Sequence, residues 1–184
     1  MGDGWFNSGD LGFILNGRLT LTGREKEMII VRGANFYCYE IEDVVNGIDG
    51  VEPTFVSSSA VPDAETGTEA LAVMFVPKAG KNDEELSALT KEIRAKVGTS
   101  LGISPAFVIP LEKNAFLKTT SGKIQRSQMK KNFEAGEYNR ILERLKAAAK
   151  KDAGPAKDDV EEKLLAIWRE LLRSGEVGLK DNFF

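Results

Sequence analysis

The sequence contains no histidine and a single cysteine, Cys38, among its 184 residues. Catalytic triads that rely on an imidazole are therefore excluded, as is a zinc site built from cysteine and histidine. One cysteine cannot form an internal disulfide, which is typical of a reducing compartment, and we expect a cytoplasmic protein. Acid–base or electrostatic chemistry must then come from Asp, Glu, Lys, Arg or Tyr.

Long apolar runs are also missing, because no stretch approaches the roughly 18 apolar residues of a membrane-spanning helix. The first residues lack the basic start and apolar core of a signal peptide. The net charge of −3 gives the chain no overall positive field for nucleic acid or acidic lipids. With 42% hydrophobic and 29% charged residues, we expect a globular protein with neither a membrane nor a nucleic acid as partner.

The patterning predicts a small α/β (α+β) sandwich. Two alternating arms over 11–22 flank Asn16-Gly17, the strongest short signal for a β-hairpin. Between 83 and 97, apolar residues recur at spacings of three and four, and Asn82 with Glu85 resembles a capping box, which predicts a helix. Further strands are expected over 27–31, 54–61, 69–76 and 105–110, and further helices over 40–46, 126–133 and 137–150. A three-stranded sheet flanked by helices, preceded by a hairpin and followed by a terminal helix, fits this order.

The end of the sequence differs in composition from the rest. Residues 151–157 include Gly and Pro and are predicted to form a linker. An amphipathic helix starts after 158, and its stripe of leucines and Trp168 needs a partner surface. An ordinary terminal helix packed on its own domain is the alternative.

Lys123 is the first candidate for chemistry. It follows Gly122 in a loop rich in Ser and Thr, where backbone N–H groups and an ammonium can approach an anion. The loop is not a Walker A motif, because Leu117 stands where that motif requires a glycine. Residues 113–131 hold six Lys or Arg and no Asp or Glu, which favours an anionic partner. A solvated turn and a basic helix face remain alternatives, and RNA binding is weaker because only Phe116 could stack on a base.

Asp10 and Arg24 are a second candidate pair. Asp10 follows Ser-Gly at the entrance to the predicted hairpin, and Arg24 follows Gly23 at its exit. A carboxylate can accept hydrogen bonds from vicinal sugar hydroxyls, and a guanidinium can add donors to the same ring. A turn-forming Asp and a surface Arg are the alternatives.

Three segments in this order resemble signature motifs of the adenylate-forming superfamily. They are WFNSGDLG, GREKEMIIVRGANFYCYEIEDVV and LKTTSGKIQR, within residues 1 to about 145. The superfamily includes acyl-CoA synthetases, nonribosomal peptide synthetase adenylation domains and firefly luciferase. The segment GANFYCYEIED is most similar to fatty acyl-AMP ligases through Asn35, Tyr37 and residues 40–42, while Phe36, Cys38 and Tyr39 depart from that pattern.

The resemblance implies a role for each candidate residue. Asp10 would bind the ribose hydroxyls of ATP, with Arg24 near the same sugar. Lys26 stands at the hinge about which the small C-terminal subdomain moves between two catalytic poses. Lys123 would be the catalytic lysine of the adenylation step. The loop around Gly33 would line the tunnel for a phosphopantetheine thiol in the second pose.

The resemblance also implies a domain plan and partners. Residues 1–25 would be the tail of an N-terminal adenylation domain, and 26–150 the C-terminal subdomain. Residues 158–184 are similar to the truncated start of an acyl or peptidyl carrier domain. The N-terminal domain would contribute most contacts to ATP and Mg²⁺, no metal site is expected within this chain, and the fragment alone is expected to be inactive.

The implied function is activation of a carboxylic acid, fatty or aryl, as acyl-AMP and its transfer to a carrier's phosphopantetheine thiol. A polyketide or nonribosomal peptide assembly line is the expected setting. The alternatives are the C-terminal part of an acyl-CoA ligase and a non-catalytic module that binds a carrier.

Overall fold

The computed structural model describes residues 4, 6–31, 33–63, 67–153, 163–164 and 166–167. In chain order its elements are β1 (Asp10–Leu15), β2 (Arg18–Arg24), the 3₁₀ helix η1 (Glu25–Glu27), β3 (Met28–Val31), β4 (Ala34–Tyr37), α1 (Cys38–Asn46), β5 (Val51–Pro62), β6 (Glu69–Pro77), α2 (Asp83–Leu101), β7 (Phe107–Pro110), α3 (Arg126–Glu134) and α4 (Asn139–Ala153).

A three-stranded mixed sheet, in the order β5-β6-β7, lies at the centre of the fold. β5 and β6 pair antiparallel, with Ser59 opposite Ala72. β6 and β7 pair parallel, which requires a crossover, and α2 supplies it. The predicted α/β sandwich with a three-stranded sheet, a preceding hairpin and flanking helices is therefore confirmed.

Two apolar cores cover the two faces of this sheet, because successive side chains of β6 point to opposite sides. Leu71, Val73 and Phe75 belong to the core shared with α1, α2 and β3. Their neighbours Ala72, Met74 and Val76 belong to the second core, which Met129 of α3 and Tyr138 complete. All six β6 side chains are buried, and the sheet is therefore the rigid platform from which the loops of the site extend.

Short-range signals account for the ends of the longest helix. Asn82 accepts a hydrogen bond from the Glu85 N–H at 2.9 Å, and the Glu85 carboxylate accepts one from the Asn82 N–H at 2.8 Å. This is the predicted capping box. Gly102 then adopts φ 70° and ends α2 after Leu101. The helix is four residues longer than predicted, because residues 98–101 can continue it until that left-handed glycine.

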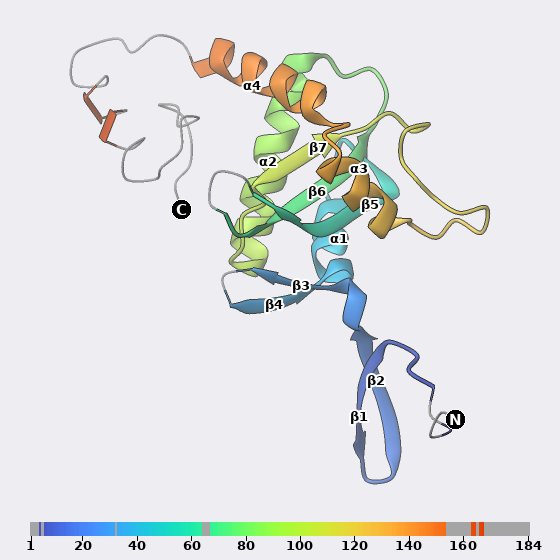
Figure 1. The fold of residues 1–184 in the computed structure, drawn as a ribbon. Helices are drawn as coiled ribbons and strands as arrows, with labels where there is room; N and C mark the ends of the chain where they lie inside the picture. Colours follow the sequence, from blue (N-terminus) through green and yellow to red (C-terminus); the bar gives the residue numbers. More distant parts are fainter. Residues whose placement is uncertain are drawn as a thin grey trace.

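The β1–β2 hairpin projects away from the sheet and its helices (Figure 1). Asn16 and Gly17 have φ of 52° and 74°, as a two-residue hairpin turn of the predicted type requires. Phe13, Ile14 and Leu15 on β1, and Leu19 and Leu21 on β2, are exposed. The hairpin therefore presents an apolar surface that the described residues leave uncovered.

The β3–β4 hairpin was only half predicted. The sequence predicts the strand over 27–31, but it does not predict the partner strand Ala34–Tyr37. Its four residues are too few to show an alternating pattern, so the pairing depends on the neighbouring strand.

None of the helices within the described residues has the length and apolar character of a membrane span. α4 extends to Ala153, and most of the predicted linker and carrier segment lies outside the described residues.

Candidate functional site

Lys123 lies on a tightly hydrogen-bonded loop between β7 and α3. The Thr119 N–H donates to the Lys123 carbonyl at 2.8 Å, and the Lys123 N–H donates to Thr119 Oγ1 at 3.0 Å. Gly122 turns the loop with φ 82°, a backbone conformation that favours glycine. The Lys123 side chain is exposed and makes no ion pair with the described residues. The hydrogen-bonded backbone of this loop thus presents the Lys123 ammonium to solvent, with no ion-pair partner among the described residues.

Asp10 and Arg24 face each other across the open end of the β1–β2 hairpin. They are paired in the strand register, and Arg24 Nε donates to Asp10 Oδ1 at 3.1 Å. Both side chains keep some exposure, 29% for Asp10 and 65% for Arg24. The second carboxylate oxygen and the remaining guanidinium donors can therefore reach a ligand with vicinal hydroxyls.

The candidate hinge residue, Lys26, is the central residue of η1, between the projecting hairpin and β3. A single 3₁₀ turn with one described cap hydrogen bond, from Met28 N–H to the Glu25 carbonyl, holds this connection. Gly33 lies in the β3–β4 turn with φ 79°, and a Cβ added there would meet nothing within 4 Å. The turn and the Lys123 loop lie on different sides of the sandwich (Figure 1). This structure does not bring Lys123 and Gly33 together.

An ion-pair cluster beside η1, in which Glu42 is buried, is one feature that the sequence did not reveal. Arg126 donates from Nε and Nη2 to the two carboxylate oxygens of Glu42, at 2.8 and 2.6 Å, and from Nη1 to Glu27 at 3.1 Å. Glu42 is 6% exposed and also accepts from the Ser58 N–H at 3.0 Å. Pairing with Glu42 raises the pKa of Arg126 despite its burial. The Arg126 cluster (Arg126, Glu42 and Glu27) thus joins α3, α1 and η1.

An open cavity of about 670 Å³ lies between η1 and the segment that follows Lys123. Gly9, Arg24 and Glu27 line one side, and Ile124 and Arg126 line the other. Among the predicted site residues, Arg24 lines this cavity. Asp10, Lys26 and Lys123 do not line it, but each is next in sequence to a lining residue.

Tyr37, which follows η1 in the chain, packs against the β1–β2 hairpin that precedes it. Its ring lies against Gly23, where an added Cβ would approach Tyr37 Cε1 to 2.5 Å. Tyr39 stacks on the same ring, with centroids 5.5 Å apart and planes 14° apart. A glycine is needed at position 23 because the ring occupies the space of a side chain.

We expect Gly23→Ala to destabilise the 184-residue chain by about 1–3 kcal/mol, since the added methyl group must displace a stacked ring. Urea denaturation followed by tyrosine fluorescence measures the loss. Gly98→Ala is the matched control, because its Cβ would meet nothing within 4 Å in α2. Adding Tyr37→Leu to Gly23→Ala should relieve the clash. Equal stability of Gly23→Ala and the wild type would contradict this packing.

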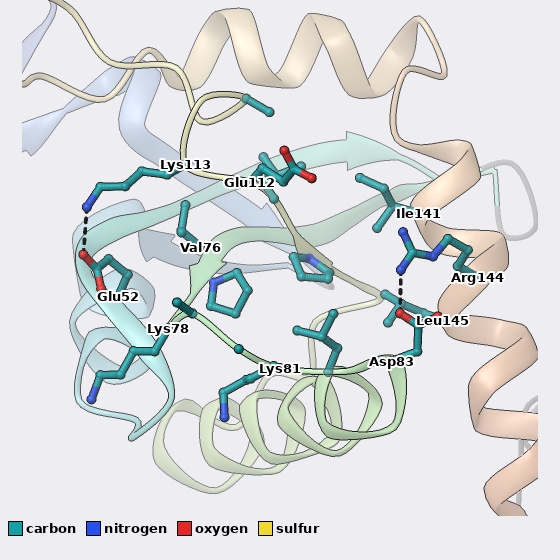
Figure 2. Close-up of a pocket in the computed structure, with 17 residues that line it drawn as sticks. Glu52, Val76, Lys78, Lys81, Asp83, Glu112, Lys113, Ile141, Arg144 and Leu145 are labelled. Atoms are coloured by element: carbon teal, nitrogen blue, oxygen red, sulfur yellow. Dashed lines mark hydrogen bonds and ion pairs between the residues drawn. The ribbon is translucent and has the colours of Figure 1, made fainter.

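A second cavity, of about 750 Å³, lies at the ends of β6 and β7 against α2 and α4. Figure 2 shows its charged rim, in which Lys113 pairs with Glu52 and Arg144 with Asp83. Its floor is apolar, with Val76, Leu111, Ile141 and Leu145 among the lining residues. None of the predicted site residues lines this cavity.

Cys38 does not provide a nucleophile to either cavity. Its side chain is 3% exposed, and burial together with the nearby Glu42 raises the pKa of the thiol to about 11. The thiolate is the reactive form, so this cysteine is inert at neutral pH. Among the described residues, no group of three or more His, Cys, Asp or Glu side chains could hold a metal ion.

Comparison with known proteins places these residues in context. No family model matches the chain. It is 34% identical over 179 residues to the nonribosomal peptide synthetase apvA of Aspergillus terreus, covering 92% of this chain and 19% of that protein. It is 35% identical over 185 residues to the nonribosomal peptide synthetase atrA of the same fungus, covering 95% and 20%. The chain thus spans about a fifth of the length of the curated relatives it matches.

Solved structures agree with these relatives. The fold matches McyG A-PCP complexed with phenylalanyl-adenylate at a TM-score of 0.83 and 37% identity, over 100% of this chain and 29% of that one. Fatty acyl-adenylate ligases from E. coli and L. pneumophila match at 0.61 and 26%, over 73% and 23%. Because of this sequence similarity and this fold, the chain belongs to the adenylate-forming family. It corresponds to the C-terminal subdomain of the family's members.

Proposed function

We propose that this chain is the mobile C-terminal subdomain of an ATP-dependent enzyme that activates a carboxylic acid as acyl-AMP. The activated acyl group then passes to the phosphopantetheine thiol of a carrier domain in a nonribosomal peptide or polyketide assembly line. The observation that carries the proposal is the exposed Lys123 ammonium on a hydrogen-bonded loop, next in sequence to Ile124, which lines a cavity together with Arg24. We further propose the domain boundaries given above, with residues 1–25 as the tail of a large N-terminal domain.

Lys123 has the properties that the adenylation step needs. A carboxylate that attacks the α-phosphate of ATP brings two anions together, and the transition state spreads negative charge over phosphoryl oxygens. An ammonium between the carboxylate and the phosphate offsets their repulsion and orients the attack. The hydrogen bonds within residues 119–123 fix the backbone from which Lys123 extends, so less ordering is required on reaching the transition state.

Asp10 and Arg24 are proposed to bind the ribose of ATP. Their cross-strand pairing orients the Asp10 carboxylate and leaves one of its oxygens to accept hydrogen bonds from the two ribose hydroxyls. In this proposal Asp10 and Arg24 contact the sugar and not the phosphates. We therefore propose that the N-terminal domain holds the remaining contacts, including those to Mg²⁺, which would offset the charge of the phosphates.

Lys26 is proposed to act through motion. It lies in η1, the short connection between the β1–β2 hairpin and the rest of the subdomain. Rotation there would move the Lys123 loop out of the active site and bring the Gly33 turn into it. Gly33 suits the second role, because its open surroundings and lack of a side chain allow a pantetheine arm to approach the backbone.

Of the two proposed classes, fatty and aryl, an acid that carries an aromatic ring has the stronger support. The solved neighbour that carries phenylalanyl-adenylate is 37% identical to this chain, whereas the fatty acyl-adenylate ligases are 26% identical. Another neighbour, 40% identical over 78% of this chain with a TM-score of 0.72, is described as a keto acid-selecting module. The similarity of residues 34–42 to fatty acyl-AMP ligases keeps a fatty acid as the second candidate.

Acid-dependent exchange of pyrophosphate into ATP tests the proposal. We expect exchange by the full-length protein, meaning the longer polypeptide that we propose contains this chain, with one of phenylalanine, phenylpyruvate or octanoate. The isolated 184-residue chain should give none, and exchange by that chain alone would contradict the domain plan. Transfer of the acyl group to a carrier domain rather than to free CoA separates the assembly-line enzyme from an acyl-CoA ligase. Absence of exchange with every acid in a broad panel would favour a non-catalytic module.

A further inference from the structure

The base of the Lys123 loop rests on an irregular part of β5. Val51 pairs with Pro77 and Val56 with Phe75, so residues 52–55 form a bulge opposite Val76. Within this bulge Thr54 has φ 66°, a strained conformation for a β-branched residue. Such strain persists only where the surrounding structure enforces it, and it concentrates at functional sites. We therefore looked to the contacts of Thr54 for a function of this bulge.

Thr54 and Phe55 together hold the ammonium of Lys118. The Thr54 N–H donates to Asn46 Oδ1 at 2.9 Å, which fixes the bulge to the end of α1. Lys118 Nζ donates to Thr54 Oγ1 at 3.2 Å and lies 3.6 Å from the centroid of the Phe55 ring. A cation this close to a ring face gains a cation–π attraction in addition to its hydrogen bond.

The Phe55 ring is itself fixed from two sides. Phe116 meets it edge to face, with centroids 5.5 Å apart. Lys113 Nζ lies 4.8 Å from the centroid of the same ring and pairs with Glu52 at 2.9 Å, a pair visible at the rim of the second cavity (Figure 2). Burial lowers the pKa of the Lys118 ammonium, and the charge on Lys113 lowers it further. Lys118 is thus a partly buried, anchored lysine, unlike the exposed Lys123.

The backbone transmits this anchoring to Lys123. Lys118 forms an isolated antiparallel bridge with Ile124, the residue directly after Lys123. One residue further along the loop, Thr119 makes both hydrogen bonds to the Lys123 backbone. Two connections therefore link the β5 bulge to the proposed catalytic lysine. The first is the side chain of Lys118, and the second is the backbone pairing of residues 118–119 with residues 123–124.

We propose that Lys118, held by the Phe55 ring and Thr54 Oγ1, is a positioning residue that sets the placement of Lys123 for adenylation. This inference rests on the proposed function of Lys123. In physical terms, the anchor restricts the loop before substrate binds, so that the ammonium of Lys123 needs little further ordering. The strained Thr54 is explained by the same role, because the bulge is what turns Phe55 and Thr54 Oγ1 toward Lys118.

The first experiment uses the 184-residue chain and requires no substrate. Lys118→Met removes the charge while keeping an apolar stem, and Phe55→Leu removes the ring. We expect each change to speed hydrogen exchange of the Lys123 amide about tenfold, because the loop hydrogen bonds open more often. Lys118→Arg keeps both the cation–π contact and a donor, and should stay within about twofold of the wild type. Lys96→Met, on the exposed face of α2, is the matched control. Unchanged exchange in Lys118→Met and Phe55→Leu would overturn the inference.

The second experiment uses the full-length protein and the acid that supports the fastest pyrophosphate exchange. We expect Lys118→Met and Phe55→Leu to lower kcat of adenylation about 10- to 100-fold with little change in KM for ATP, as for a misplaced catalytic group. Transfer from a supplied acyl-adenylate to the carrier should stay within about twofold of the wild-type rate, since Lys123 does not act in that step.

Equal losses in both steps, not restored by Lys118→Arg, would indicate a general structural role and overturn the inference. Full adenylation by Lys123→Ala would instead reject the proposed function, while the amide-exchange result would still report on the anchor.

Discussion

Replacing Lys123 with alanine in the full-length protein is expected to slow acid-dependent pyrophosphate exchange by about 10²–10³-fold. This is the effect of removing one preorganised electrostatic donor from a transition state that develops negative charge. The fold should be unaffected, because the Lys123 side chain is exposed and makes no ion pair with the described residues, while its backbone contacts do not depend on the side chain. Measurement of exchange at saturating acid and ATP isolates the effect on kcat.

The adenylation defect should be confined to one half-reaction. Transfer from a supplied acyl-adenylate to the carrier thiol is expected to proceed normally in Lys123→Ala, since the Gly33 turn rather than the Lys123 loop is proposed to serve that step. Lys130→Ala is the control for loss of a positive charge nearby, because Lys130 pairs with Glu69 and Glu134 on the sandwich itself. Near-normal exchange in Lys123→Ala would refute its assignment as the catalytic lysine.

Breaking the Arg126 cluster is expected to have the largest effect on stability. Arg126→Met leaves Glu42 as a 6% exposed carboxylate that still accepts a hydrogen bond from the Ser58 N–H. Removal of one member of a buried ion pair costs about 3–5 kcal/mol, because the remaining charge stays desolvated and unpaired. We expect a loss of about 3 kcal/mol, near the lower limit, since Arg126 keeps 23% of its side-chain exposure. Urea denaturation of the 184-residue chain measures this loss.

An exposed ion pair in the same chain provides the comparison. Arg144 pairs with Asp83, and both side chains are more than half exposed. Arg144→Met should therefore cost about 0–1 kcal/mol, as surface pairs do. Adding Glu42→Gln to Arg126→Met should restore part of the stability by removing the unpaired charge. A loss for Arg126→Met no larger than that for Arg144→Met would show that the cluster contributes little to the fold.

The sequence predicted those parts of the fold that local chemistry specifies. Asn16-Gly17 encodes a turn because both residues tolerate positive φ, and Asn82 with Glu85 encodes the start of α2 through two mutual hydrogen bonds. The short apolar run of β6 is typical of a strand that is buried on both faces, and its residues do contact two different cores. Each of these signals lies within a few residues of the element that it specifies.

The contacts that assemble the candidate site could not be predicted in the same way. Arg126 is 84 residues from Glu42 and 99 from Glu27, and Lys118 is 64 from Thr54. No local pattern marks such partners, because their contact depends on how the sheet brings α1, η1 and the Lys123 loop together. The sequence also did not predict the bulge at Thr54, because Pro53 and Thr54 are residues that occur at the end of an ordinary strand. The order of the three motifs was enough to predict the candidate site residues. The structure adds the side chains that contact and position those residues.

The arrangement around η1 also bears on where adenylating enzymes can be recombined. All three residues of the Arg126 cluster lie after Lys26, so a chimera joined at that residue inherits the cluster intact from one parent. The contact of Tyr37 with Gly23 crosses the same junction. A donor subdomain with a large aromatic residue at position 37 will therefore be more stable when joined to acceptors that have glycine at position 23, which is a simple rule for choosing parents in subdomain exchange.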